Sequence, residues 1–147
     1  MLAAMLEPAP PCEAYNVPIR VLIVDDSQSF LDAAGVLLER EGLSVAGVAS
    51  TTATALRQAE QLQPDVVLVD ITLGGESGFD VARLLFENDR DDWPVVILIS
   101  THEEADFADL IAASPASAFL PKSDLSAQLI QQIVEAKAGA GEEGDAG

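Results

Sequence analysis

The sequence predicts an α/β fold in which a mostly parallel five-stranded sheet is covered by helices on both faces. The first observation behind this prediction is a set of five short apolar runs rich in β-branched residues, the pattern of strands buried on both sides. The second is that stretches with helical periodicity lie between these runs. At 147 residues, 49% of them hydrophobic, the chain is long enough for one domain with an ordinary core.

The predicted strands are IRVLIV (19–24), SVAGVA (44–49), DVVLV (65–69), PVVILI (94–99) and SAFLP (117–121). Each predicted helix between or after them carries apolar residues on one face. The face residues are Phe30, Ala34, Leu37 and Leu38 in the first helix, Ala55, Ala59 and Leu62 in the second, Val81, Leu84 and Leu85 in the third, which follows Gly78, and Leu125, Leu129, Ile133 and Val134 in the last. The fourth helix is predicted from EEADFADLIAA (103–113), which begins with acids, as a helix N-terminus prefers. Gly42 and Pro64 fall where helices should end, and Ser123 or Asp124 is the expected cap of the last helix.

Right-handed crossovers leave few topologies for such an alternation. The leading one is a flavodoxin-like (βα)5 three-layer sandwich with strand order 2-1-3-4-5, in which strands one and three are neighbours at the topological switch point. We expect this domain to cover residues 19–138, between a loose N-terminal extension (1–18) and a disordered acidic tail (139–147).

The composition argues against several kinds of partner. The formal charge of −18 opposes binding to nucleic acid or to an anionic membrane, since both need basic patches. No apolar stretch approaches the roughly 20 residues of a membrane helix, and the N-terminus is a poor secretory signal. Cys12 is the only cysteine, so neither a disulfide framework nor a cysteine metal site is available.

Carboxylates follow two strands that should be neighbours. Asp25 and Asp26 come directly after the first strand, and Asp70 comes directly after the third. Ligands of open α/β sheets bind in the crevice at the carboxyl ends of such strands. Three crowded carboxylates repel one another unless some are protonated or a cation lies among them. Mg²⁺ suits such a site, because it takes one or two carboxylates together with phosphate oxygens and water.

Two further strand ends suggest that an anion also binds. The fourth strand ends at Ser100 and Thr101, and the fifth at Lys122, one of two lysines in the chain. A lysine ammonium is a point-charge partner for phosphate, and a serine hydroxyl can donate to the same group. This combination fits phosphoryl transfer onto Asp70, because aspartate forms aspartyl-phosphate intermediates.

Each of these residues also has a simpler explanation. Asp70 could cap the loop that follows it, and Asp25 or Asp26 could cap the helix that begins near Ser27. Ser100 could be an ordinary strand-end hydroxyl, and Lys122 could be surface charge. Their joint occurrence at four strand ends favours a functional site.

With these residues in place, the sequence resembles the receiver domain of two-component response regulators over Ile19 to Ala138. The acidic pair matches Asp25 and Asp26, and the phosphoacceptor matches Asp70. The switch hydroxyl matches Ser100, the lysine matches Lys122, and the aromatic position of the fifth strand matches Phe119, which could also be a plain core aromatic. The spacings of 44, 30 and 22 residues, from 26 to 70, 100 and 122, fit the family.

The resemblance implies roles for these residues. Asp70 would receive a phosphoryl group from a sensor histidine kinase or a histidine phosphotransfer protein. Asp26, Asp70 and the main-chain carbonyl of Thr72 would bind Mg²⁺, with Asp25 contributing through water. Ser100 would move towards the phosphate and Phe119 would follow inward, which would reshape the surface of the fourth helix, fifth strand and fifth helix.

Two positions near this site depart from the family's pattern, and two others flank the phosphorylation site. Gly74 stands where the family usually has proline, which predicts a more mobile loop. Ser123 stands where many members have a cis-favouring proline, so a cis bond is not required there. Thr72 and His102 occupy the positions that influence phosphate lifetime in the family; the lone histidine is also compatible with an ordinary exposed loop residue.

The resulting expectation is a stand-alone, non-enzymatic, cytoplasmic switch that acts by binding a downstream protein, or an intermediate of a phosphorelay. A pseudo-receiver that binds proteins without being phosphorylated is the main alternative, and the complete acid set with Lys122 argues against it. A phosphatase of the haloacid dehalogenase type would need D-x-D after the first strand, where this chain has Asp25-Asp26.

Overall fold

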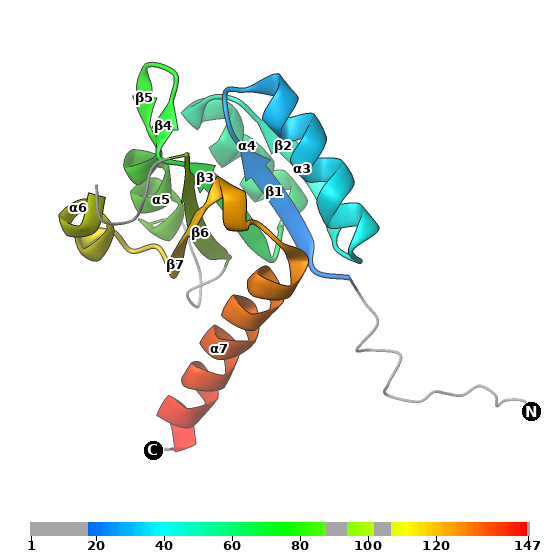
Figure 1. Cartoon of the computed structure of the whole chain (residues 1–147). Coiled ribbons are helices and arrows are strands. Elements are labelled where there is room, and N and C mark those ends of the chain that lie inside the picture. The colour runs from blue at the N-terminus through cyan, green and yellow to red at the C-terminus, as the bar shows by residue number, and fades with distance from the viewer. Residues whose placement is uncertain (1–17, 88–93, 102–106, 147) are drawn as a thin grey trace, which may run out of the picture.

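A computed structural model describes residues 18–87, 94–101 and 107–146, with the main chain alone for 138–146. Its centre is a parallel five-stranded sheet in the order β2-β1-β3-β6-β7 (Figure 1). The strands are β1 (Arg20–Val24), β2 (Ser44–Ala49), β3 (Val66–Asp70), β6 (Val95–Ser100) and β7 (Ala118–Pro121). The predicted order 2-1-3-4-5 is therefore confirmed, with each strand within one residue of its expected ends.

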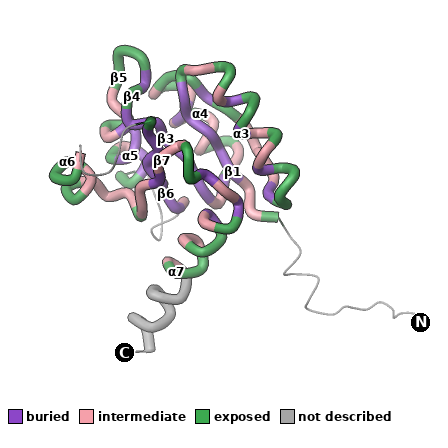
Figure 2. The backbone as a smooth tube through the Cα atoms, viewed as in Figure 1, coloured by how far each residue is buried: buried purple, intermediate pink, exposed green. Residues whose placement is uncertain are grey.

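Helices cover both faces of the sheet and produce two separate cores. They are α3 (Gln28–Arg40), α4 (Thr52–Leu62), α5 (Gly78–Glu87), α6 (Ala108–Ala113) and α7 (Ala127–Ala146). Alternate residues of β1 face opposite layers: Val21 and Ile23 pack with α3 and α7, whereas Leu22 and Val24 pack with α4 and α5. Burial is deepest in the strands (Figure 2).

The helix boundaries have local causes. Ser27 caps α3 by accepting a hydrogen bond from the main-chain N–H of Phe30, and Thr51 caps α4 through Thr54. The α4 helix ends at Gln63, whose φ of 53° is left-handed, and Pro64 prevents continuation as predicted.

The last helix differs from the prediction in two ways. Ser126, rather than Ser123 or Asp124, caps α7 by accepting from Leu129 N–H, because residues 122–124 form the 3-10 turn η2 (Lys122–Asp124). The Glu41 carboxylate accepts a further bond at this end, from Ala127 N–H at 2.8 Å. The main chain of α7 continues to Ala146, where we expected a tail from residue 139; extending an established helix costs far less than nucleating one.

The loop after Asp70 forms a small hairpin that the sequence did not predict. It consists of β4 (Thr72–Leu73) and β5 (Glu76–Ser77), which pair antiparallel. Gly74, at the first turn position, has a φ of 60°, as the tight hairpin turns require.

At one edge of the sheet, β2 is covered by side chains of its own neighbours. Its pairing with β1 contains a one-residue irregularity, in which Ala46 has no partner between Val45 and Gly47. The outward N–H of Val45 donates to Glu39 Oε2 at 3.4 Å, and the outward carbonyl of Val48 accepts from Gln58 Nε2 at 2.8 Å.

Several expectations lie outside the described residues. These are the extension 1–17 with Cys12, the start of the fourth helix (103–106), and His102. Within the described part of the chain, no helix is long and apolar enough to cross a membrane.

Candidate functional site

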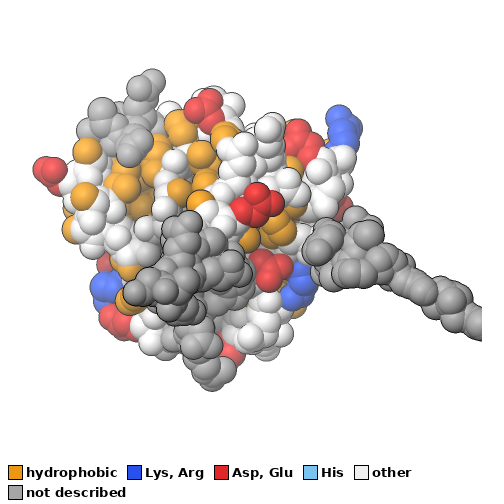
Figure 3. Space-filling model, turned by 90° about the horizontal axis from the view of Figure 1, so that it is seen from below, with side chains coloured by type: hydrophobic (Ala, Val, Ile, Leu, Met, Phe, Trp, Pro, Cys, Tyr) orange, Lys and Arg blue, Asp and Glu red, His pale blue; other side chains and the backbone are white. Residues whose placement is uncertain are grey.

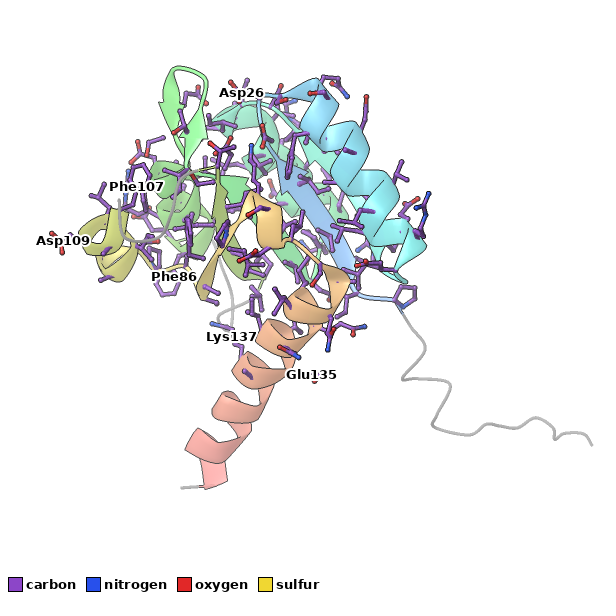
Figure 4. All side chains as sticks on the ribbon, in the orientation of Figure 1. Asp26, Phe86, Phe107, Asp109, Glu135 and Lys137 are labelled. Carbon is purple, nitrogen blue, oxygen red and sulfur yellow. The ribbon has the colours of Figure 1, made fainter. Side chains whose placement is uncertain are left out.

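Three carboxylates meet at the carboxyl ends of β1 and β3, because these strands are direct neighbours. Asp25 follows β1 and is fully buried, Asp70 ends β3 and is 7% exposed, and Asp26 is exposed. One carboxylate oxygen from each lies within 4.8 Å of the others. Figure 4 shows Asp26 at this edge, above the end of β1.

Asp25 is held from two sides. Its Oδ1 accepts a hydrogen bond from Ser27 N–H at 2.8 Å, which fixes the turn into α3. Its Oδ2 lies 2.6 Å from Lys122 Nζ as an ion pair. This oxygen nevertheless has no hydrogen-bond partner of good geometry among the described residues. A fully buried carboxylate oxygen in that state has capacity for a further partner.

Asp70 accepts two hydrogen bonds, one on each oxygen. Thr72 N–H donates to Oδ1 at 3.1 Å, and Lys122 Nζ donates to Oδ2 at 3.2 Å. Burial raises the pKa of Asp70, and the Asp25 charge raises it further, while Thr72 N–H and Lys122 lower it; the net direction is upward. The fold therefore gives its ionised form less stabilisation than water does.

Lys122 connects the far side of the sheet to these acids. It follows β7, two strands from β3, and its side chain is only 14% exposed. Burial by itself would lower the pKa of Lys122, but hydrogen bonding and charge from Asp25 and Asp70 outweigh burial and raise it. Its ammonium also lies 4.3 Å from the centre of the Phe30 ring.

The β4–β5 hairpin forms one wall of the site. A β-carbon on Gly74 would lie 3.5 Å from Asp26 Oδ2, so the hairpin turn lies beside that carboxylate. Glu76 Oε1 accepts from Thr52 N–H at 2.7 Å, which attaches the hairpin to the start of α4 and lowers the pKa of Glu76. Behind the hairpin, a β-carbon on Gly78 would overlap the main-chain carbonyl oxygen of Asp70.

The other predicted residues that the structure describes lie on the strands β6, β7 and β4. Ser100 ends β6, between β3 and β7, and is 1% exposed. Phe119 lies on β7 and packs, partly buried, against the core under α4 and α5. Thr72 is exposed on β4, and its N–H contacts Asp70.

The donor set fits Mg²⁺. Its three carboxylates are hard oxygen ligands, and the buried Asp25 Oδ2 lacks a well-directed partner. Lys122 supplies one positive charge against three negative ones, which leaves a net negative crevice that a divalent cation would neutralise.

Sequence reasoning missed three contributors to the site. Phe30 was expected only as a core residue of the first helix, yet its ring faces Lys122. Ser27 was considered only as the start of that helix, and Glu76 was not considered at all. The run from Asp25 to Phe30 carries a cap signal, but no sequence pattern indicates the contact with Lys122, 92 positions after Phe30.

Comparison with known proteins supplies an independent line of evidence. The family model described as the response regulator receiver domain matches residues 21–134. The response regulator GacA of Pseudomonas aeruginosa is 32% identical over 82% of this chain and 56% of its own length. The transcriptional regulatory protein MctR of Rhizobium johnstonii is 34% identical over 84% of this chain and 56% of its own. The chain thus spans about half the length of these curated relatives.

Solved structures of response regulators also match this chain. The receiver domain of the response regulator NarL from Mycobacterium tuberculosis is 28% identical, with a TM-score of 0.65 over 85% of this chain and 97% of that one. A LuxR-family response regulator from Aurantimonas is 27% identical, with a TM-score of 0.68 over 83% and 86%.

Proposed function

Because the chain belongs to the response regulator receiver domain family of two-component systems, we propose that it is a Mg²⁺-dependent switch phosphorylated on Asp70. Receiver domains are signalling modules that bind Mg²⁺ in an acidic pocket and interact with histidine kinases or phosphotransfer proteins. The observation that carries the proposal for this chain is the single ammonium of Lys122 lying against both Asp25 and Asp70.

In the proposed step, a carboxylate oxygen of Asp70 forms a bond to the phosphorus of a phosphohistidine. The phosphorus–nitrogen bond breaks, and the leaving imidazole takes up a proton. Lys122, already beside Asp70 Oδ2, faces the charge that develops on the phosphoryl oxygens. Thr72 N–H holds Asp70 Oδ1 and so limits rotation of the carboxylate.

We assign the metal to Asp26, Asp70 and the main-chain carbonyl of Thr72, with Asp25 acting through water. When bound, Mg²⁺ would supply charge neutralisation and orientation of the phosphoryl oxygens. Ser100 is the proposed switch hydroxyl and Phe119 the aromatic residue that follows it. Thr72 and His102 are the proposed positions that set phosphate lifetime.

We propose that the output is a protein contact, without nucleic acid or membrane as a direct partner. The charge of −18 supports this, since it repels nucleic acid and anionic membranes. A sensor histidine kinase or histidine phosphotransfer protein would be the donor, in the cytoplasm, and the receiver domain itself would act as a non-enzymatic signalling module.

The test is phosphorylation by acetyl phosphate, followed by intact mass. The wild type with Mg²⁺ should gain one phosphoryl group that hydroxylamine removes, as expected of an acyl phosphate. Asp70→Asn should gain none. Asp80→Asn, which changes an exposed aspartate on α5, is the matched control and should behave as the wild type. Failure of the wild type, under conditions that modify a known receiver, would reject the switch in favour of a pseudo-receiver.

A further inference from the structure

The ammonium of Lys122 has a third neighbour besides its two carboxylates. Its Nζ lies 2.6 Å from Asp25 Oδ2, 3.2 Å from Asp70 Oδ2 and 4.3 Å from the centroid of the Phe30 ring. A cation within about 6 Å of an aromatic centroid is attracted by the ring's quadrupole, and more strongly where water is excluded. The three hydrogens of the ammonium thus have two anionic oxygens and one aromatic ring around them.

The ring is held in place by the same acid that holds the lysine. Asp25 Oδ1 accepts from Ser27 N–H, and Ser27 Oγ accepts from Phe30 N–H at 3.3 Å. The Phe30 ring contacts the Lys122 ammonium, and this ammonium forms an ion pair with Asp25 Oδ2. These four contacts connect the main chain of Phe30 to Asp25 and its ring to Lys122, so both parts of Phe30 are linked to groups that line the crevice. The ring also packs, partly buried, against the core shared by α3 and α7.

We propose that Phe30 is a positioning residue for Lys122, and that its aromatic face keeps the ammonium directed at the phosphoryl site on Asp70. This inference rests on the proposed phosphorylation of Asp70. A lysine ammonium is a point charge at the end of a flexible four-carbon chain, so its position is not fixed by the side chain alone. Electrostatic stabilisation of a transition state requires that such a charge be in place beforehand. The ring restricts the ammonium on the side that no carboxylate occupies.

The test must separate the electrostatic character of the ring from its volume. Phe30 is replaced, by site-specific incorporation, with phenylalanines carrying increasing numbers of ring fluorines, which weaken the quadrupole at nearly constant shape. The same residues at Phe86, 49% exposed on α5, are the matched control. Phe30→Tyr keeps an aromatic ring at this position and should behave as the wild type. Phe30→Leu removes the ring and should lose its effect on Lys122.

Two readouts are needed. The NMR shifts of the Lys122 ε-methylene protons in the unmodified protein report the ring current, and should move downfield in Phe30→Leu but not in Phe30→Tyr. The rate of phosphorylation by acetyl phosphate at saturating Mg²⁺ should fall stepwise along the fluorinated series, by about two- to tenfold in total. The Phe86 series should leave the rate unchanged.

The outcomes are distinguishable. A wild type that is phosphorylated, with a rate that is flat or rises along the Phe30 series, would overturn the positioning role and leave the proposed function intact. A wild type that is not phosphorylated would overturn both, even if the methylene shifts still reported the ring. A stepwise fall with rescue by tyrosine would support the inference.

Discussion

The central strands of the sheet are packed more deeply than the edge strand β7 and the helix α6. Every residue of Val21–Val24 and Val66–Asp70, in β1 and β3, is buried, and these strands carry the three carboxylates. At one edge of the sheet, β7 has one buried residue, Leu120, and the helix α6 that precedes it has none. Viewed from below, hydrophobic side chains gather at the surface on the side that carries α6 (Figure 3). The three carboxylates thus lie on deeply buried strands, whereas Lys122 follows β7. The region expected to respond, β7 with α6, has few buried residues, as elements that move usually do.

The largest expected effect comes from a matched pair of leucines, one in a central strand and one on α6. Leu68→Ala in β3 removes a fully buried side chain and should lower the free energy of unfolding by about 2–5 kcal/mol. Leu110→Ala on α6, where the side chain is 55% exposed, should change it by less than about 0.5 kcal/mol. Urea denaturation measures both. Equal losses would contradict the difference in packing.

Two glycines, Gly75 in the hairpin turn and Gly78 at the start of α5, test how closely the chain after Asp70 packs on that residue. Gly78→Ala should destabilise the protein by about 1–3 kcal/mol, because its β-carbon would overlap the Asp70 carbonyl. It should also slow phosphorylation by displacing the main chain of Asp70. Gly75→Ala, with open space around its β-carbon and no positive φ, should be nearly neutral. If both variants melted like the wild type, the close approach at Gly78 would be wrong.

A smaller effect is expected from the charge of Asp70. Its pKa is raised, first by burial, so its ionised form costs stability at neutral pH. Without divalent metal, Asp70→Asn should therefore melt at a slightly higher temperature than the wild type. Added Mg²⁺ should stabilise the wild type and have less effect on the variant. Calorimetry with EDTA or Mg²⁺ checks this, and destabilisation of the variant in EDTA would contradict it.

The smallest effect concerns the contact between the hairpin and α4. The pKa of Glu76 is lowered from its ordinary value, because its ionised carboxylate accepts hydrogen bonds from Thr52. The contact is then fully present above the ordinary glutamate pKa and is lost as pH falls through the lower folded value. Thr52→Pro removes the N–H donor at a helix position that tolerates proline, and should return the pKa of Glu76 to its usual range. Carboxyl-carbon NMR titration measures it; an unchanged value would remove Thr52 as the cause.

Sequence reasoning worked where one local pattern determines the structure. The apolar runs located all five strands within one residue, and the alternation with helices gave the order that brings Asp25, Asp26 and Asp70 together. It failed where a contact joins segments that are distant in the sequence, and where two nearby residues could serve equally well as a helix cap. Ser126 rather than Ser123 caps α7. Neither the hydrogen bond that Thr52 N–H donates to Glu76 nor the ring of Phe30 beside Lys122 has a sequence signature.

The edge strand β2 has a consequence for behaviour at high concentration. A strand whose outward main-chain groups are open can add a strand from another molecule, which is the usual start of sheet-to-sheet aggregation. Here a second molecule would have to displace Glu39 from Val45 and Gln58 from Val48, and then match an edge made irregular at Ala46. The protein therefore has a built-in barrier to polymerisation along this edge.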